Sequence, residues 1–227
     1  MNNSKKQTGR IAGILYLVLA VTAAIAIVYV PSKIHGEVNA SQTVSNILKN
    51  EFLYRNGIIS HLISQVVFIF LGVTLYHLLK EVNENIAKLM FALILVQVPI
   101  VFIAESFKLT ALMVAKGHLL QHVPVVEAHD TIILLLKTHG NCIATLELFW
   151  GLWLIPFGLL VYKSGFMSKL LGILLLLGGI AYIFESLALL LNPGIHAAVV
   201  NFTMIIYSIA EIAIIFWLLI VGAKKEK

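Results

Sequence analysis

Four glutamates lie inside apolar stretches that are long enough to cross a bilayer: Glu105, Glu147, Glu185 and Glu211. A charged side chain at bilayer depth is energetically costly, so such residues usually face a protein interior and often mark a functional site. Carboxyl groups there can bind cations or exchange protons. These four side chains are therefore the first candidates for chemistry in the chain.

The depth of each glutamate follows from its distance to the lysine that ends its apolar stretch. At a helical rise of about 1.5 Å per residue, Glu105, Glu147 and Glu185 lie about 24 to 25 Å from that lysine. Glu211 lies deeper, at about 20 Å. We therefore expect the first three carboxyls to share one layer in the outer half of the membrane.

Other polar residues fall near this layer, and they are Gln65, His61, Lys108 and His139. An outward-opening polar cavity is the simplest interpretation. Because burial and mutual repulsion disfavour charged carboxylates, we expect at least one glutamate to be protonated at neutral pH. Lys108, three residues after Glu105, should pair with it and keep it ionised, which leaves Glu147 or Glu185 as the proton carrier.

A metal site is a secondary hypothesis. His61 and His139 could join Glu147 at the mouth of the cavity, since zinc is bound by imidazole nitrogens and carboxylate oxygens. His118 and His122 are also four residues apart, but Pro124 and a loop setting favour histidines at the membrane surface. We therefore expect no cofactor.

Composition defines the class. Of 227 residues, 60% are hydrophobic and only 12% are charged, and the mean hydropathy is +0.97. Too few charged residues are present to cover a soluble globule, which predicts an all-α, polytopic integral membrane protein in contact with the lipid bilayer. The net charge of +5 comes with no groove-reading motif, so no nucleic-acid partner is expected. ATP-binding and common hydrolase motifs are likewise absent from the sequence.

Six transmembrane helices are predicted within a single domain over residues 1–227, because about 20 apolar residues span a bilayer. They cover about 11–30, 57–79, 89–115, 139–162, 170–191 and 197–221. Between the first two, Val44, Ile47, Leu48 and Phe52 recur at helical spacing, which predicts a short amphipathic helix on the membrane surface.

Basic residues predict the orientation of the spans. Ten lysines and arginines fall at the two termini and at the second and fourth connections, and four fall on the opposite side. The positive-inside rule then places both termini in the cytoplasm. We expect the membrane to be the plasma membrane. The first apolar stretch resembles a cleavable signal peptide, but it is longer than the usual signal core, so we expect it to be retained.

Small residues predict which face of each span is buried. On the fourth span the stripe contains Gly140, Ala144, Glu147, Gly151 and Gly158. The corresponding faces are Gly178, Tyr182 and Glu185 on the fifth span, and Asn201, Ser208 and Glu211 on the sixth. Small residues let a neighbouring helix approach, so these glutamates should point into the bundle.

Two pairs of spans resemble each other in sequence. Residues 87–90 lead to Glu105 much as residues 168–171 lead to Glu185. This indicates repeated helical hairpins, spans two and three with spans four and five, related by an axis along the membrane normal. The alternative is that apolar helices resemble one another by composition alone.

Several specific strings run along the chain. They are Arg10–Tyr16, Tyr54–Ile58 followed by Gln65, His139-Gly140, Phe149–Gly158, Tyr162–Phe166 and Leu171–Ile173. On these strings the chain resembles, nearly end to end, the bacterial membrane family known as domain of unknown function 4386. The resemblance implies a polytopic bacterial membrane protein and implies no particular activity.

Three kinds of function remain open. The first is binding or transport of a small polar or cationic solute through the cavity lined by protonatable glutamates. The second is an intramembrane enzyme that acts on a lipid or prenyl substrate with Glu or His-Glu acid/base chemistry. The third is a structural or protective membrane partner. The missing metal triad and the parallel repeat favour the first over an enzyme.

Overall fold

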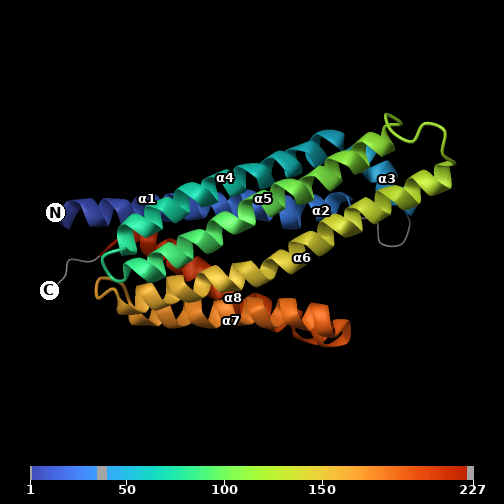
Figure 1. Ribbon diagram of the computed structural model, residues 1–227. Helices are drawn as coiled ribbons and strands as arrows, with labels where there is room; N and C mark the ends of the chain where they lie inside the picture. The colour runs from blue at the N-terminus through green and yellow to red at the C-terminus, as the bar shows by residue number, and fades with distance from the viewer. Residues whose placement is uncertain (1, 35–39, 224–227) are drawn as a thin grey trace. The chain divides into compact units, whose positions relative to one another are not determined.

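The computed structural model describes residues 2–34 and 40–223, and all regular structure in these residues is helical. The helices are α1 (Asn2–Ala24), α2 (Val30–Ile34), α3 (Ala40–Lys49), α4 (Glu51–Leu79), α5 (Glu84–Ala115), α6 (Val125–Lys163), α7 (Lys169–Leu191) and α8 (Pro193–Ile220) (Figure 1). A π-helical turn, Ile25–Tyr29, joins α1 to α2. The predicted all-α fold is therefore confirmed. The lysines of the tail, residues 224–227, lie outside the described residues.

Within the described residues, six helical segments are long and apolar enough to cross a membrane. They are Lys5–Ile34, Glu51–Leu79, Glu84–Ala115, Val125–Lys163, Lys169–Leu191 and Gly194–Ile220. The number agrees with the sequence prediction. The fourth candidate span, α6, starts at Val125, well before the predicted residue 139, so His129 and Asp130 belong to the helix. The hairpin repeat and the single transmembrane domain stay predictions.

Local sequence explains where two of the helices start. Asn192 accepts hydrogen bonds from the backbone N–H groups of Gly194 and Ile195 at 3.0 and 3.3 Å, and Pro193 opens α8. An asparagine cap followed by proline is a strong helix start, since proline has no N–H to leave unpaired. Asn83 likewise accepts from the N–H of Ile86 at the start of α5.

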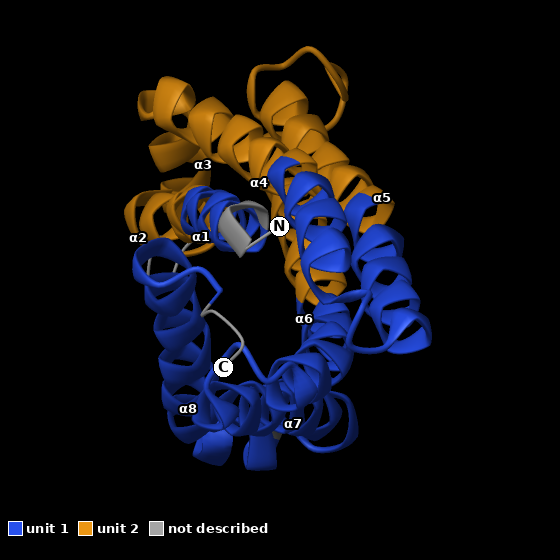
Figure 2. Cartoon of the chain, turned by 90° about the vertical axis from the view of Figure 1, so that its left-hand side faces the viewer, with its two compact units in different colours: residues 1–18, 67–98, 144–227 blue, residues 19–66, 99–143 orange. Residues whose placement is uncertain are grey.

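The chain divides into two compact units, which Figure 2 colours separately. Unit 1 comprises Met1–Val18, Val67–Val98 and Ala144–Lys227, and unit 2 comprises Leu19–Val66 and Pro99–Ile143. The four intramembrane glutamates are shared between them. Glu105 belongs to unit 2, whereas Glu147, Glu185 and Glu211 belong to unit 1.

In unit 1, α6 packs against α7 through glycines. A Cβ built on Gly151 would lie 2.5 Å from the carbonyl oxygen of Gly179, and one on Gly158 would lie 2.9 Å from that of Gly172. The predicted small-residue stripe therefore does bring two helices together at these positions. At its outer end the prediction was wrong, because no described atom lies within 4 Å of a Cβ built on Gly140.

In unit 2, the predicted amphipathic segment folds as the helix α3, and its place at the membrane surface stays a prediction. Val44 and Ile47 of α3 are buried in an apolar cluster with residues of α2, α4, α5 and α6. Leu48 and Phe52 are exposed, and Phe52 belongs to α4. Protein side chains thus cover Val44 and Ile47 of the apolar face and leave Leu48 uncovered.

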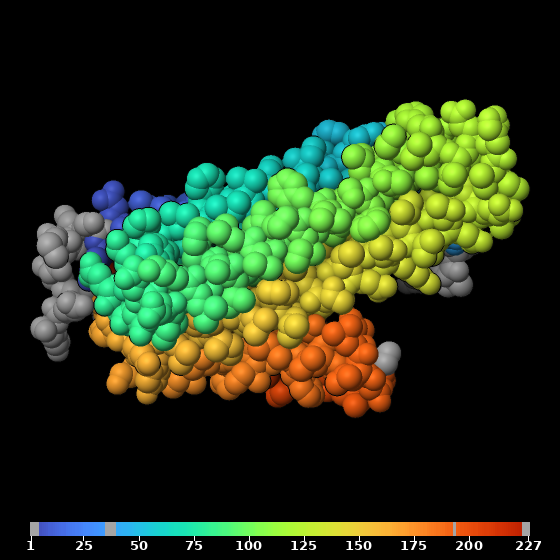
Figure 3. Space-filling model, in the orientation of Figure 1, coloured from blue at the N-terminus to red at the C-terminus, as the bar shows by residue number. Residues whose placement is uncertain are grey.

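The connection between α5 and α6 is a surface feature of unit 2. His118 and His122 are exposed, and the yellow-green atoms of this region are visible at one end of the space-filling view (Figure 3). Leu120 in this connection has φ of 57°, the left-handed conformation typical of turns. The sequence therefore correctly predicted surface histidines here.

Candidate functional site

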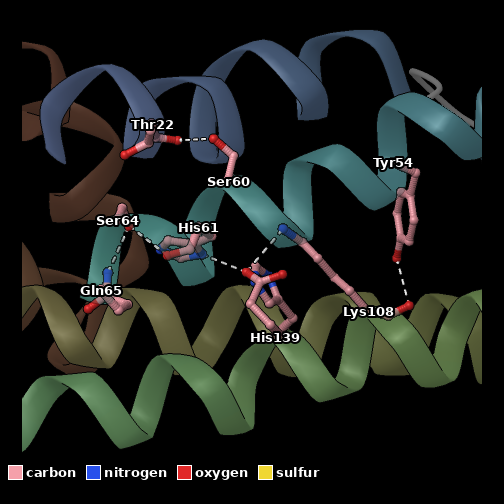
Figure 4. Close-up of polar contacts among 9 residues, drawn as sticks. Thr22, Tyr54, Ser60, His61, Ser64, Gln65, Lys108 and His139 are labelled. Atoms are coloured by element: carbon pink, nitrogen blue, oxygen red, sulfur yellow. Dashed lines mark hydrogen bonds and ion pairs between the residues drawn. The ribbon is translucent and has the colours of Figure 1, made fainter. Parts of the chain in front are cut away.

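Three long helices of unit 2 bring four titratable side chains together, a set that we call the His–Glu cluster: His61 from α4, Glu105 and Lys108 from α5, and His139 from α6. Oε1 of Glu105 is the common point. His61 Nδ1 lies 2.6 Å from it, His139 Nε2 lies 2.9 Å from it, and the Nζ atom of Lys108 lies 3.3 Å from it. Figure 4 shows His61, Lys108 and His139 converging on this point.

The cluster is buried. His61 and Glu105 are 1% and 2% exposed, and the side chain of His139 is 13% exposed. Three donors crowd onto one carboxylate oxygen, while the other oxygen of Glu105, Oε2, has no hydrogen-bond partner among the described residues. The Nε2 atom of His61 is buried and equally unpartnered. Leaving such an atom unsatisfied costs about 1–3 kcal/mol, so both atoms are suited to contact a ligand.

Two hydrogen bonds within α4 and one between α4 and α5 lie next to the cluster (Figure 4). Ser64 donates a hydrogen bond to the carbonyl oxygen of His61 at 2.6 Å, and Gln65 donates to the hydroxyl of Ser64 at 3.1 Å. Tyr54 of α4 donates to the carbonyl oxygen of Lys108 at 3.0 Å. Gln65 is therefore buried next to the cluster and does not touch the carboxylate of Glu105 in this arrangement.

In unit 1, Glu211 of α8 is held by two tyrosines. Tyr16 of α1 donates to its Oε2 at 3.0 Å, and Tyr182 of α7 donates to its Oε1 at 2.8 Å. The ring of Tyr182 stacks on that of Tyr207, with centroids 3.8 Å apart. Both carboxyl oxygens of Glu211 are thus satisfied by interhelical hydrogen bonds.

Glu185 of α7 also has partners. Thr203 of α8 donates a hydrogen bond to its Oε2, and His196 lies 3.9 Å from its Oε1. Glu185 and Thr203 are both buried. The predicted buried face of the last span was wrong at Asn201, which is exposed, because the buried stripe passes through Thr203 and Ala210 instead.

Glu147 of α6 differs from the other three glutamates. It makes no hydrogen bond or ion pair with any described residue, although its side chain is only partly exposed. Glu185 is near enough to repel it electrostatically. Glu147, Glu185 and Glu211 all lie close enough to Tyr207 to interact electrostatically with its hydroxyl group. We call these three glutamates the carboxyl cluster.

The structure therefore groups the predicted site residues in two sets. Gln65, His61, Glu105, Lys108 and His139 lie in unit 2, with the last four in contact. The carboxylate between the two histidines is Glu105, not Glu147 as the metal hypothesis supposed. Tyr16, Tyr207 and Thr203 are the partners that sequence reasoning missed. Only Tyr16 carried a signal, since it ends one of the strings of the family resemblance.

Comparison with known proteins decides the family. The family described as domain of unknown function 4386 matches residues 11–222, nearly the whole chain. The chain belongs to this family. The resemblance drawn from the sequence strings is thus confirmed.

A curated protein is also similar to this chain. An uncharacterized protein of Archaeoglobus fulgidus is 28% identical over 153 residues, which cover 67% of this chain and 75% of the relative. No solved structure matches the chain. The comparisons thus establish a family of unknown function and supply neither an activity nor a substrate.

Proposed function

We propose that the protein binds, and carries across the plasma membrane, a small polar or cationic solute, and that Glu147 exchanges a proton as it does so. One observation carries the proposal. Of the four intramembrane glutamates, Glu105, Glu185 and Glu211 each have donors, whereas Glu147 has no partner among the described residues. Glu147 is therefore the carboxyl that remains available.

The physical reason is the energy of a charge inside a bilayer. An ionised carboxylate without a partner is strongly disfavoured there, so Glu147 must hold a proton or pair with a cation. These two states exclude each other, because the proton and the cation occupy the same oxygen atoms. Such exclusion is the basis of coupling between a solute and a proton.

The surroundings of Glu147 favour a cationic solute. Glu185 adds a second carboxyl nearby, and Tyr207 and Trp150 add aromatic rings to the same unit, with Trp150 edge-on to Tyr182 at 5.7 Å. Aromatic faces attract cations, most strongly where water is excluded. In this proposal the cavity opens to the outside and both termini are cytoplasmic, as the distribution of basic residues predicts.

Infrared spectroscopy tests the protonation directly. The wild-type protein in membranes should show the carbonyl stretch of a protonated carboxyl at neutral pH, and that band should lose intensity in Glu147→Gln. Glu81→Gln is the matched control, because Glu81 lies in the connection between α4 and α5 and is exposed. An unchanged band in Glu147→Gln would remove the basis of the proposal.

Transport is tested in vesicles that contain a pH-sensitive dye. Tetramethylammonium, guanidinium and ethidium are added in turn to wild-type vesicles. At least one of these cations should cause the protein to release protons. Glu147→Gln should abolish this release without loss of folded protein, since glutamine resembles a protonated carboxyl in shape. Proton release that is equal in the variant and the wild type would contradict the role of Glu147.

A catalytic function on a lipid or prenyl substrate is the second candidate, and the His–Glu cluster favours it. A histidine beside a buried carboxylate is a common acid/base arrangement, and His139 is the partly exposed member. Mass spectrometry of membrane lipids from cells that express wild type or His139→Gln is the test. A lipid product that depends on His139 supports catalysis, and identical lipid profiles count against it.

A further inference from the structure

We infer that the His–Glu cluster is a binding site for a divalent transition-metal ion of the zinc type, with His61, Glu105 and His139 as its protein ligands. Each of the three offers a ligand atom, and these atoms all lie within 4.8 Å of one another. Two imidazole nitrogens and one carboxylate oxygen form a ligand set that zinc and related ions prefer.

The spacing of the ligand atoms is close to what an ion requires. In a tetrahedral site, metal–ligand bonds of about 2.0–2.2 Å place neighbouring ligand atoms about 3.3–3.6 Å apart. Nδ1 of His61 and Nε2 of His139 lie 2.6 and 2.9 Å from Oε1 of Glu105. An outward movement of the two nitrogens by about 0.4–1.0 Å relative to Oε1 would make room for the ion.

A second observation points independently to a ligand. Nε2 of His61 and Oε2 of Glu105 are fully buried, and neither has a hydrogen-bond partner among the described residues. Buried polar atoms of a folded protein are normally paired. An ion at the cluster would use Oε2, or would reorient the His61 ring, and so would satisfy atoms that the protein itself leaves unpaired.

His139 is the most exposed of the three proposed ligands. Its side chain is 13% exposed, whereas those of His61 and Glu105 are 1% and 2% exposed. The ion would therefore meet His139 first and then the two buried ligands. With three protein ligands, a position remains open for water or another small molecule, which is the coordination typical of zinc sites that do chemistry.

Lys108 would compete with the ion for the carboxylate of Glu105. Its ammonium lies 3.3 Å from Oε1 of Glu105, where it competes with a divalent cation for the same carboxylate. Metal binding must displace this lysine from the oxygen. Removing its charge with Lys108→Met should therefore tighten metal binding, whereas an ion-pair network without a metal role has no reason to gain affinity.

The experiment uses the purified full chain in detergent, stripped of metal with a chelator and titrated with Co²⁺. Cobalt replaces zinc in such sites and gives visible absorption bands when nitrogen and oxygen ligands surround it at low coordination number. We expect one equivalent of Co²⁺ to bind the wild type and added Zn²⁺ to displace it. Size-exclusion profiles and circular dichroism report whether each variant is folded.

The variants separate the cluster from other histidines. Glu105→Gln and His139→Gln should each weaken Co²⁺ binding at least tenfold, since each loses a direct ligand. The matched control is His118→Gln, because His118 is an exposed histidine of the α5–α6 connection and should bind as the wild type does. Lys108→Met should bind more tightly than the wild type.

Three results would overturn the inference: no stoichiometric Co²⁺ or Zn²⁺ binding by folded wild type, equal binding by folded Glu105→Gln and His139→Gln, or loss of binding in His118→Gln. If the ligand variants fail to fold, Lys108→Met decides, and unchanged or weaker binding by that variant rejects the site. Metal binding here and proton exchange at Glu147 involve different side chains, so either can fail alone.

Discussion

The hydroxyl of Tyr16 lies 3.0 Å from Oε2 of Glu211, and this hydrogen bond joins α1 to α8 across 195 residues of sequence. The carboxyl is shared, because Tyr182 of α7 donates to the other oxygen at 2.8 Å. One glutamate therefore ties three helices of unit 1 together. Its first role is to organise these helices, which explains why Glu211 is a weaker candidate for proton exchange than Glu147.

Tyr16→Phe should destabilise the protein by about 1 kcal/mol, since interhelical hydrogen bonds in membranes contribute about 0.6 kcal/mol on average and at most about 1.7 kcal/mol. Tyr182→Phe should cost a similar amount, and the double variant should reveal coupling through Glu211. Denaturant unfolding in mixed micelles measures these changes. Tyr29→Phe, at an exposed tyrosine, is the control, and a Tyr16→Phe variant as stable as wild type would show that the bond contributes nothing.

The same substitution should have opposite effects at two glycines of α6. Gly151→Ala places a Cβ 2.5 Å from the carbonyl oxygen of Gly179, so α6 and α7 must separate. Overpacking of this kind costs about 1–3 kcal/mol. Gly140→Ala meets no described atom within 4 Å, and alanine is favoured over glycine in a helix by about 0.8–1.0 kcal/mol.

Thermal unfolding of the two alanine variants tests the α6–α7 contact. The melting temperature of Gly151→Ala should fall and that of Gly140→Ala should stay level or rise. Equal melting temperatures for the two variants would mean that α6 and α7 do not approach each other through Gly151.

One ion pair outside the apolar spans should respond to pH. Lys5 contacts Glu81 at 2.6 Å, and its hydrogen bond and charge hold the pKa of Glu81 below the usual value of 4.5. A lowered pKa stabilises the fold above about pH 4.5, and that contribution disappears as the pH falls through the lowered value. The stability difference between wild type and Glu81→Gln should therefore shrink toward zero in acid.

Melting curves from neutral pH to pH 3 measure this loss. The effect should be small, because the side chain of Glu81 is 60% exposed, and it should weaken in high salt as charges are screened. A difference between wild type and Glu81→Gln that grows in acid would contradict the assigned role of Lys5.

Orientation is tested by chemical labelling. Single cysteines replace Gln42 in α3 or Glu84 at the start of α5, in a Cys142→Ala background. In intact cells an impermeant maleimide should label the cysteine at position 42, and the one at position 84 only after the membrane is opened. The reverse pattern would place the termini outside and contradict the positive-inside prediction.

Sequence reasoning was sufficient for features that depend on near neighbours in the chain. The six apolar helices follow from local hydropathy, because each span is one continuous stretch. The pairing of Lys108 with Glu105 follows from a spacing of three residues, which places both on one helix face. The inward faces of Tyr182 and Glu185 follow from the same periodicity, and both are buried.

The composition of each cluster was decided only by the tertiary structure. Depth along a span can be counted from the sequence, but the rotation of a helix about its axis and its choice of neighbour cannot. His61 and His139 meet Glu105, which lies 44 and 34 residues away, although depth alone also allowed Glu147. Which carboxyls find donors depends on helix packing between distant segments, and that packing leaves Glu147 without a partner among the described residues.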